Sequence, residues 1–93
     1  MVITSIRIHA RPEKKKEILQ AITDLSKQIM MNKGCVKSSL YQDMEDSDSF
    51  YIIEEWKSFE DLEEHKKSKE FSILRGLNSM LAESLDIRYA KRL

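Results

Sequence analysis

The side chains best suited to chemistry in this sequence are close together. Glu54 and Trp56 alternate along an apolar segment, and His65 follows shortly after it. A neutral imidazole can accept a proton near pH 7, and a nearby carboxylate can take part in the transfer. An indole ring provides a flat apolar wall for a planar substrate. This combination favours proton abstraction from a small aromatic molecule, with His65 and Glu54 as candidate catalytic residues and Trp56 as a candidate binding residue.

Each of these residues also has a purely structural interpretation. A tryptophan fills the core of many small proteins. A buried glutamate is often one half of an ion pair with a lysine or arginine. His65 follows Leu62 at i+3, so it can be a hydrogen-bonded residue between a helix and a sheet. The residue types alone leave both interpretations open.

Other side chains extend the candidate site or exclude alternatives. Neither His9 nor His65 has further ligands at a recognisable metal-binding spacing, so we expect no metal site. Cys35 is the only cysteine, which excludes an internal disulfide. The further candidate substrate-binding residues are Phe71, Tyr41, Arg7 and Asn78.

The first half of the chain predicts a strand, a helix and a second strand. Apolar residues alternate with polar ones over 2–10, and Pro12 then ends the strand and suits the first turn of a helix. Gly34 supplies the left-handed conformation that ends this helix, and a strand over 35–42 follows. The apolar stripe of the helix consists of Ile18, Ile22, Leu25 and Ile29.

The second half predicts a hairpin, a divided helix and a last strand. Short polar side chains over 43–49 indicate a turn, and residues 50–56 form the clearest strand. Ser58 and Ser68 each suit a helix N-cap, and the second helix would carry Phe71, Leu74, Leu77 and Leu81. Alternation over 85–89 predicts the last strand.

The order β-α-β-β-α-β, with the second helix divided, predicts an α+β protein with a ferredoxin-like fold. Its four-stranded antiparallel sheet would carry the helices on one face. The strand over 50–56 is apolar on both sides, so the other face also needs a cover. We therefore expect a homodimer in which two sheets face each other.

The length and composition set the class of protein. A chain of 93 residues predicts one domain spanning residues 1–93. The 16 basic and 16 acidic residues balance, so there is no electrostatic reason to expect nucleic acid or membrane as partners. No apolar run approaches the roughly 18 residues that span a bilayer, and no signal-peptide segment is present. We therefore expect a cytoplasmic location.

The segment over 52–71 resembles the signature of the antibiotic biosynthesis monooxygenase family, whose pattern is approximately E-x-W-x-S followed by leucine, histidine and phenylalanine. The end of the first strand at Pro12, the Gly34-Cys35 pair, and Tyr41 followed by Asp43 also match. The resemblance thus covers nearly the whole chain. The residues that match the signature are Glu54, Trp56, Ser58, Leu62, His65, Ser68 and Phe71.

This resemblance implies a dimeric α+β barrel with a pocket between sheet and helices in each subunit. It also implies oxygenation of a small quinol or phenol by dioxygen without flavin, haem or metal. Many relatives carry a second histidine where this chain has Lys69-Glu70. The asparagine and histidine of haem-degrading relatives are missing, so haem cleavage is not expected. The alternative is a non-oxidative protein that binds or isomerises a small metabolite on the same fold.

Overall fold

The structure is a computed structural model that describes all residues from 1 to 93. Its centre is one antiparallel sheet with the strand order β2-β3-β1-β4. The inner strands β1 and β3 pair along their whole length, and β2 and β4 form the two edges. This confirms the predicted α+β class and the hairpin of the second and third strands. The strands are β1 (Val2–His9), β2 (Cys35–Gln42), β3 (Ser49–Trp56) and β4 (Asp86–Lys91).

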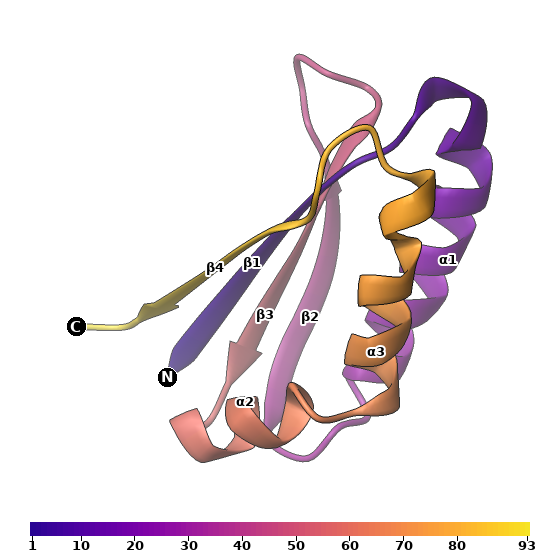
Figure 1. Cartoon of the computed structure of the whole chain (residues 1–93). Coiled ribbons are helices and arrows are strands. Elements are labelled where there is room, and N and C mark those ends of the chain that lie inside the picture. The colour runs from indigo at the N-terminus through magenta and orange to yellow at the C-terminus, as the bar shows by residue number, and fades with distance from the viewer.

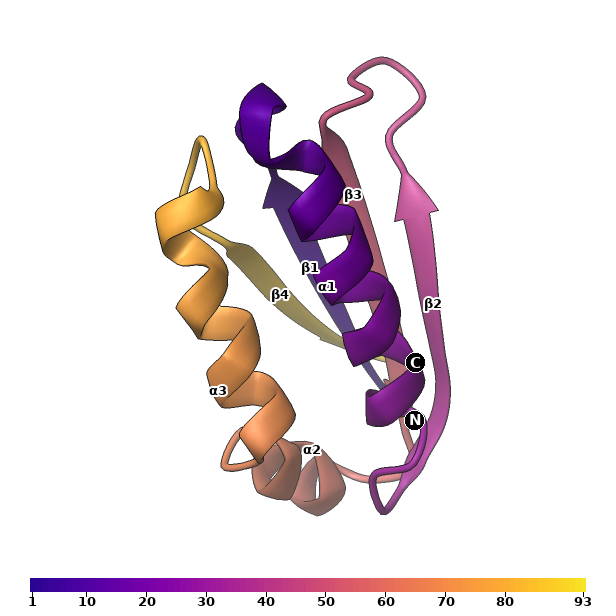
Figure 2. The same ribbon diagram turned by 90° about the vertical axis from the view of Figure 1, so that its right-hand side faces the viewer.

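The helices all lie on one face of the sheet, as Figure 1 shows. The long α1 and the shorter α3 run along this face, and α2 lies across the end of the sheet where β3 finishes (Figure 2). The second helix is divided, as the sequence predicts. The helices are α1 (Lys15–Ile29), α2 (Phe59–His65) and α3 (Lys69–Gly76), with 3₁₀ turns at Pro12–Lys14 and Leu77–Met80.

Two serine caps produce the division between α2 and α3. The Ser58 hydroxyl accepts the backbone N–H of Asp61 at 3.1 Å, and the Ser68 hydroxyl accepts that of Phe71 at 3.2 Å. Each bond satisfies an N–H group that has no partner within the first turn of its helix. The caps therefore fix where each helix starts, and they place His65 at the last residue of α2.

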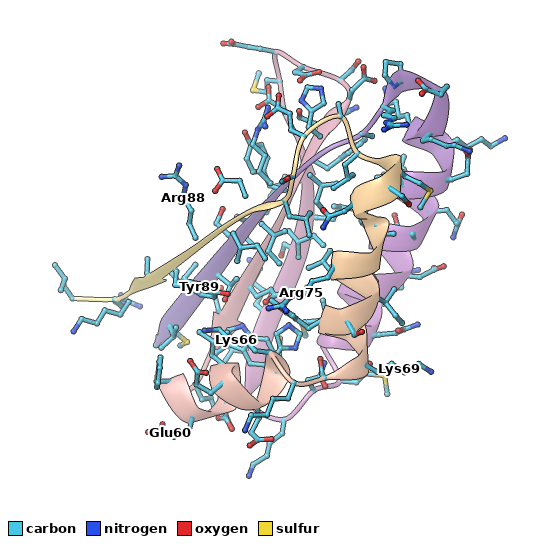
Figure 3. All side chains as sticks on the ribbon, in the orientation of Figure 1. Glu60, Lys66, Lys69, Arg75, Arg88 and Tyr89 are labelled. Carbon is cyan, nitrogen blue, oxygen red and sulfur yellow. The ribbon has the colours of Figure 1, made fainter.

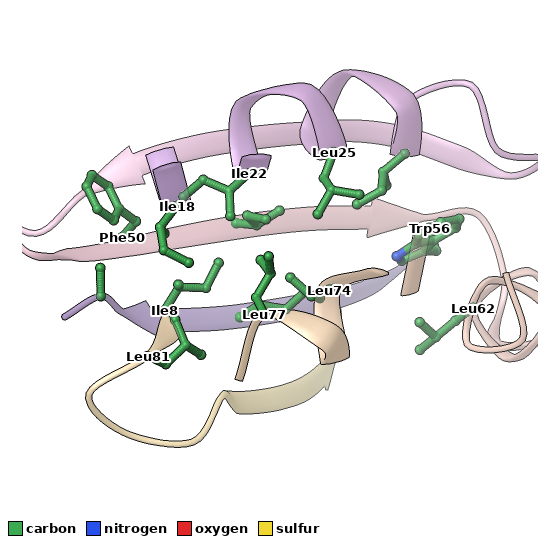
Figure 4. Close-up of a cluster of buried hydrophobic side chains, with 14 residues drawn as sticks. Ile8, Ile18, Ile22, Leu25, Phe50, Trp56, Leu62, Leu74, Leu77 and Leu81 are labelled. Carbon is green, nitrogen blue, oxygen red and sulfur yellow. The ribbon is translucent and has the colours of Figure 1, made fainter. Parts of the chain in front are cut away.

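The core lies between the sheet and the helices (Figure 4). The predicted stripe of α1 is buried at Ile18, Ile22, Leu25 and Ile29. In Figure 4, Trp56 and Leu62 lie together at the end of this cluster. The aromatic and aliphatic side chains of β3 and α2 thus close the core at one end of the sheet.

The prediction for the second helix is wrong at its end. The α-helix stops at Gly76, and Leu77 belongs to the 3₁₀ turn that follows. Leu81 is extended and pairs with Ala10 in an isolated bridge, although it is buried as expected. Both leucines still reach the core, Leu77 from the tighter 3₁₀ turn and Leu81 from an extended conformation. Their spacing in the sequence therefore looks like a continued helix.

Gly34 ends the first helical region in the left-handed conformation that the sequence predicts, with φ at 81°. A Cβ atom at this position would collide with the side chain of Asp61 in α2. The carbonyl of Gly34 also accepts the backbone N–H of Lys57 at 2.9 Å. This turn therefore lies close against the start of α2, and only glycine fits there.

The opposite face of the sheet has no helix over it (Figure 1). Alternation along the strands directs polar and apolar side chains toward this open face, among them Ile3, Arg7, Tyr51 and Ile53. None of the helices is both long and apolar enough to cross a lipid bilayer.

Candidate active site

Four of the predicted site residues come together between the sheet and the helices. Glu54 and Trp56 lie two positions apart on β3, so both face the helices. His65 ends α2, and Phe71 lies in the first turn of α3. All four are buried, with at most 3% of the residue surface exposed. The structure therefore brings these four predicted residues together in one buried cluster.

The four side chains make direct contact. The Trp56 indole Nε1–H donates a hydrogen bond to Glu54 Oε1 at 3.2 Å. His65 Nε2 lies 3.6 Å from the same oxygen. The Trp56 and His65 rings are 4.5 Å apart at 30°, and the Phe71 ring meets His65 edge-on at 5.5 Å. Two nitrogen atoms thus point at one oxygen of Glu54.

The second ring nitrogen of His65 faces a helix cap. His65 Nδ1 lies 3.4 Å from the Ser68 hydroxyl, which already accepts the Phe71 backbone N–H. The hydroxyl hydrogen of Ser68 is therefore available to donate to Nδ1. This arrangement favours the tautomer that carries its proton on Nε2, directed at Glu54 Oε1.

Three buried polar atoms in this region have no hydrogen-bond partner, namely Glu54 Oε2, His65 Nε2 and Thr4 Oγ1. Thr4 faces Glu54 in the register of β1 and β3. Thr4 is not among the site residues predicted from the sequence. The available signal was a hydroxyl side chain on a strand face that is otherwise apolar, since Ile6 and Ile8 follow on the same face. Buried polar groups are nearly always bonded, so three unpartnered ones together mark a site.

Burial moves the two titratable groups in opposite directions. Removal from water raises the pKa of Glu54 to about 7, and the hydrogen bond from Trp56 acts against this rise. Burial lowers the pKa of His65 to about 4, and the charge of Glu70 acts in the other direction. Near neutral pH the imidazole is uncharged, and Glu54 is close to the midpoint of its titration. A carboxyl group in that state suits general-base catalysis.

Two hollows lie on either side of α2. The larger has a volume of about 580 Å³ and is mostly apolar, with walls from Val2, Leu62 and Tyr89. Lys66 lies at its rim, with Nζ 4.3 Å from the centre of the Tyr89 ring (Figure 3). The smaller hollow, of about 190 Å³, is lined by polar residues and reaches His65. Only the larger one has the size and apolar lining of a typical ligand pocket.

The larger hollow borders the buried cluster without containing it. Val2 faces Trp56 in the register of β1 and β3, and Tyr89 faces Thr4 in the register of β1 and β4. Leu62 precedes His65 by about one turn of α2. The walls of the hollow are thus immediate neighbours of the cluster.

The structure does not bring the remaining predicted binding residues to this cluster. Arg7 and Tyr41 lie on the open face of the sheet, because their strand positions alternate with those of the core. Asn78 is exposed on the 3₁₀ turn after α3. No group of three or more histidine, cysteine, aspartate or glutamate side chains is placed to hold a metal ion.

Comparison with known protein families shows to which family this chain belongs. The model of the antibiotic biosynthesis monooxygenase family matches residues 1–73. The protein belongs to this family. The matched region includes all four clustered residues and Thr4. A search of curated proteins finds no match.

Solved structures confirm the fold of this family member. A protein from Pseudomonas aeruginosa is 28% identical, with a TM-score of 0.85 over 99% of this chain and 93% of its own. A conserved protein from Methanosarcina mazei is 24% identical, with a TM-score of 0.89 over 100% of this chain and 94% of its own. A structure named antibiotic biosynthesis monooxygenase is 21% identical, with a TM-score of 0.90 over 100% and 99%. At such identities the likeness to the last two shows the fold alone.

Proposed function

We propose that this family member is a monooxygenase that acts on a small electron-rich aromatic substrate, a phenol or hydroquinone, with dioxygen and without a cofactor. The observation that supports this proposal is that Glu54 is buried and that one of its two carboxyl oxygens has no hydrogen-bond partner. One oxygen of this buried carboxyl group faces two N–H donors, while the other oxygen has no partner. An oriented carboxyl group with a free oxygen can take a proton from a bound hydroxyl group.

Deprotonation is the chemical step that such a substrate needs. Ground-state dioxygen reacts slowly with neutral closed-shell molecules, but a phenolate or hydroquinone anion can pass an electron to it. A hydroquinone that becomes a hydroxyquinone loses four electrons. One atom of dioxygen enters the product and the other leaves as water, so the substrate supplies every electron and no cofactor is required. The protein must bind the substrate, remove its proton and exclude water.

We propose different roles for Glu54 and His65. The sequence suggested His65 as the base, with Glu54 assisting. In our proposal Glu54 Oε2 is the base, because burial leaves its pKa near 7 and this oxygen is free. His65 is a weak base, since burial lowers its pKa to about 4, and its Nε2–H instead orients Glu54 Oε1. Trp56 donates to the same oxygen and forms a wall of the site, and Phe71 holds the imidazole ring in place.

The larger hollow beside α2 is the proposed substrate pocket. Its volume of about 580 Å³ accommodates a small aromatic molecule, and its walls adjoin Trp56 and Thr4. Glu54 does not line this hollow, so the substrate hydroxyl reaches Glu54 Oε2 only when side chains at the pocket wall move. Tyr89 is the candidate for this movement because 47% of its surface is exposed.

We propose that the working form is a homodimer. The open face of the sheet carries Ile3, Tyr41 and Ile53, which no helix of the chain covers. Two such faces packed together would bury this apolar surface. Sedimentation equilibrium measures the mass directly, and a stable monomer at micromolar concentration would contradict this part of the proposal.

The proposed function is tested by oxygen uptake with a panel of hydroquinones and phenols. The absorption spectrum of the purified protein is recorded first, because a flavin or haem band would contradict the cofactor-free reaction. Glu54→Gln keeps the shape of the side chain and removes the base, so uptake on an accepted substrate should fall by about 10²–10⁴-fold. Glu55→Gln is the matched control, since it neutralises the next carboxylate on the opposite face of β3.

An equal loss in both variants, or no loss in Glu54→Gln, would contradict the assigned base. No uptake across the whole panel would favour the non-oxidative alternative, in which the same site binds or isomerises a metabolite.

A further inference from the structure

We infer that Thr4 is a further binding residue of this site and that its hydroxyl group holds the substrate oxygen against Glu54. This inference rests on the proposed function, because it deepens the role of the same site. It selects aromatic substrates that carry a free hydroxyl group over those in which the hydroxyl group is methylated.

The position of Thr4 supports this inference. It lies in the inner strand β1, with none of its surface exposed, and it faces Glu54 on one side and Tyr89 on the other. Side chains that face each other across antiparallel strands have Cβ atoms about 4.5–5.5 Å apart. The Thr4 hydroxyl is therefore close to the Glu54 carboxyl group and to the strand that borders the larger hollow.

The missing hydrogen bond of Thr4 points to a ligand. Its Oγ1 has no partner in the protein, although threonine and valine have the same shape. Valine would fill this place in the core without burying an unpartnered hydroxyl group. The next residues on the same face, Ile6 and Ile8, are apolar and completely buried. The hydroxyl group of Thr4 thus makes no hydrogen bond that would stabilise the fold.

In this inference a hydroxyl group of the substrate enters between Thr4 and Glu54 when the pocket wall moves. Its O–H would donate to Glu54 Oε2, and its oxygen would accept the hydroxyl hydrogen of Thr4. When the proton moves to Glu54 Oε2, only the O–H bond of the substrate breaks, and the negative charge stays on the substrate oxygen. The hydrogen bond from Thr4 then becomes charge-assisted and stronger. A methyl ether has no proton to donate, so it cannot make the bond to Glu54.

The test measures binding in the absence of oxygen. Hydroquinone and 1,4-dimethoxybenzene are titrated by calorimetry under nitrogen into the full chain and its variants. Thr4→Val should weaken the binding of hydroquinone by about 10-fold, the size of one hydrogen bond, while Thr4→Ser stays within about 3-fold of the unchanged protein. Binding of 1,4-dimethoxybenzene should be weaker from the start and the same in all variants.

Thr23→Val is the matched control for loss of a hydroxyl group. The Thr23 hydroxyl donates to the backbone carbonyl of Leu19 in α1 at 2.6 Å and is not part of the cluster. This variant should bind hydroquinone normally. The thermal midpoint supplies a second measurement: Thr4→Val should keep or raise the midpoint, because the removed hydroxyl group has no partner in the folded protein.

Several results would overturn the inference. These are equal hydroquinone affinity in Thr4→Val and the unchanged protein, equal affinity of the unchanged protein for the two probes, and no binding of hydroquinone at all. A lower thermal midpoint for Thr4→Val than for Thr4→Ser would also overturn it, since it would indicate a structural hydroxyl group. Failure of the oxygenase proposal is seen separately, as absent oxygen uptake beside intact selective binding.

Discussion

The two histidines of the chain lie on opposite sides of the sheet, His9 in β1 on the open face and His65 in α2 over the covered face, and their surroundings differ. His9, on the open face, has Nδ1 3.1 Å from the Ser49 hydroxyl and 3.3 Å from Asp46. His65, on the covered face, has Nε2 with no bonded partner and lies beside a carboxyl group that also has a free oxygen. The histidine on the open face thus has hydrogen-bond partners, whereas Nε2 of the histidine over the covered face has none.

The polar network of the open face is complete. The Ser49 hydroxyl donates to Asp46 at 2.8 Å and accepts from Arg7 at 3.2 Å. Its hydrogen bond is the main cause that lowers the pKa of Asp46. Backbone N–H groups, with the hydroxyl of Tyr51, lower the pKa of Asp43 in the same way. These hydrogen bonds connect the turn before β3 with β3 and β1. Groups that are buried and unsatisfied are ready for a ligand.

The largest expected effect concerns the pH dependence of stability. Glu54 titrates at about 7 when folded and near 4.5 when exposed, so it makes the protein less stable as pH rises from 4.5 to 7. His65 titrates at about 4 when folded and near 6.5 when exposed, so it makes the protein more stable as pH rises from 4 to 6.5. In the unchanged protein the two effects largely cancel.

Single variants should reveal each effect. In His65→Gln the free energy of unfolding should fall by about 3 kcal/mol between pH 4.5 and 7, and in Glu54→Gln it should rise by a similar amount between pH 4 and 6.5. Urea unfolding over this pH range measures both, with the double variant as the baseline. Parallel curves for the two single variants would mean that the burial of the pair does not control its titration.

The second prediction compares the same substitution, histidine to glutamine, at His65 and at His9. His65→Gln removes the ring whose Nε2 lies 3.6 Å from Glu54 Oε1 and helps to orient it. A misplaced catalytic group can cost about 100-fold in rate, so oxygen uptake on an accepted substrate should fall by about 10–100-fold. His9→Gln should leave uptake within about two-fold, because His9 lies on the other face. A similar loss in both variants would remove the functional distinction between the faces.

The third prediction addresses the open face through Ser49. Ser49→Ala leaves Arg7 and Asp46 without a partner that each now has, so the free energy of unfolding should fall by about 1–3 kcal/mol. Binding of hydroquinone should not change. Urea unfolding and calorimetry report the two quantities on the same sample. Unchanged stability would show that this network is dispensable, and weaker binding would connect it to the site.

The smallest effect is expected for the predicted residues that lie away from the cluster. Asn78→Ala changes an exposed side chain on the 3₁₀ turn, so both stability and hydroquinone affinity should change by less than about 0.5 kcal/mol. Tyr41→Ala is the companion variant for affinity only, because Tyr41 lies on the open face that the proposed dimer would cover. A clear loss of affinity in either variant would extend the site beyond the four clustered residues.

Most elements could be predicted from local patterns, because short-range geometry determines them. Alternation along the strands, the stripe of α1, the left-handed Gly34 and the caps at Ser58 and Ser68 all depend on neighbours within one or two turns. The end of the second helix was missed. The core accepts Leu77 and Leu81 from a 3₁₀ turn and an extended residue as readily as from an α-helix.

The repeats of strands and helices were enough to predict that Glu54 and Trp56 share one strand face and that His65, at i+3 from Leu62, lies on the inner side of its helix. Three-dimensional packing was needed to learn which oxygen of Glu54 is bonded and which is free, and that Thr4 lies opposite Glu54. Hydrogen bonds depend on tenths of an ångström, and the groups around Glu54 come from β1 and α2 as well as from its own strand. Those distances are set by how the helices pack on the sheet.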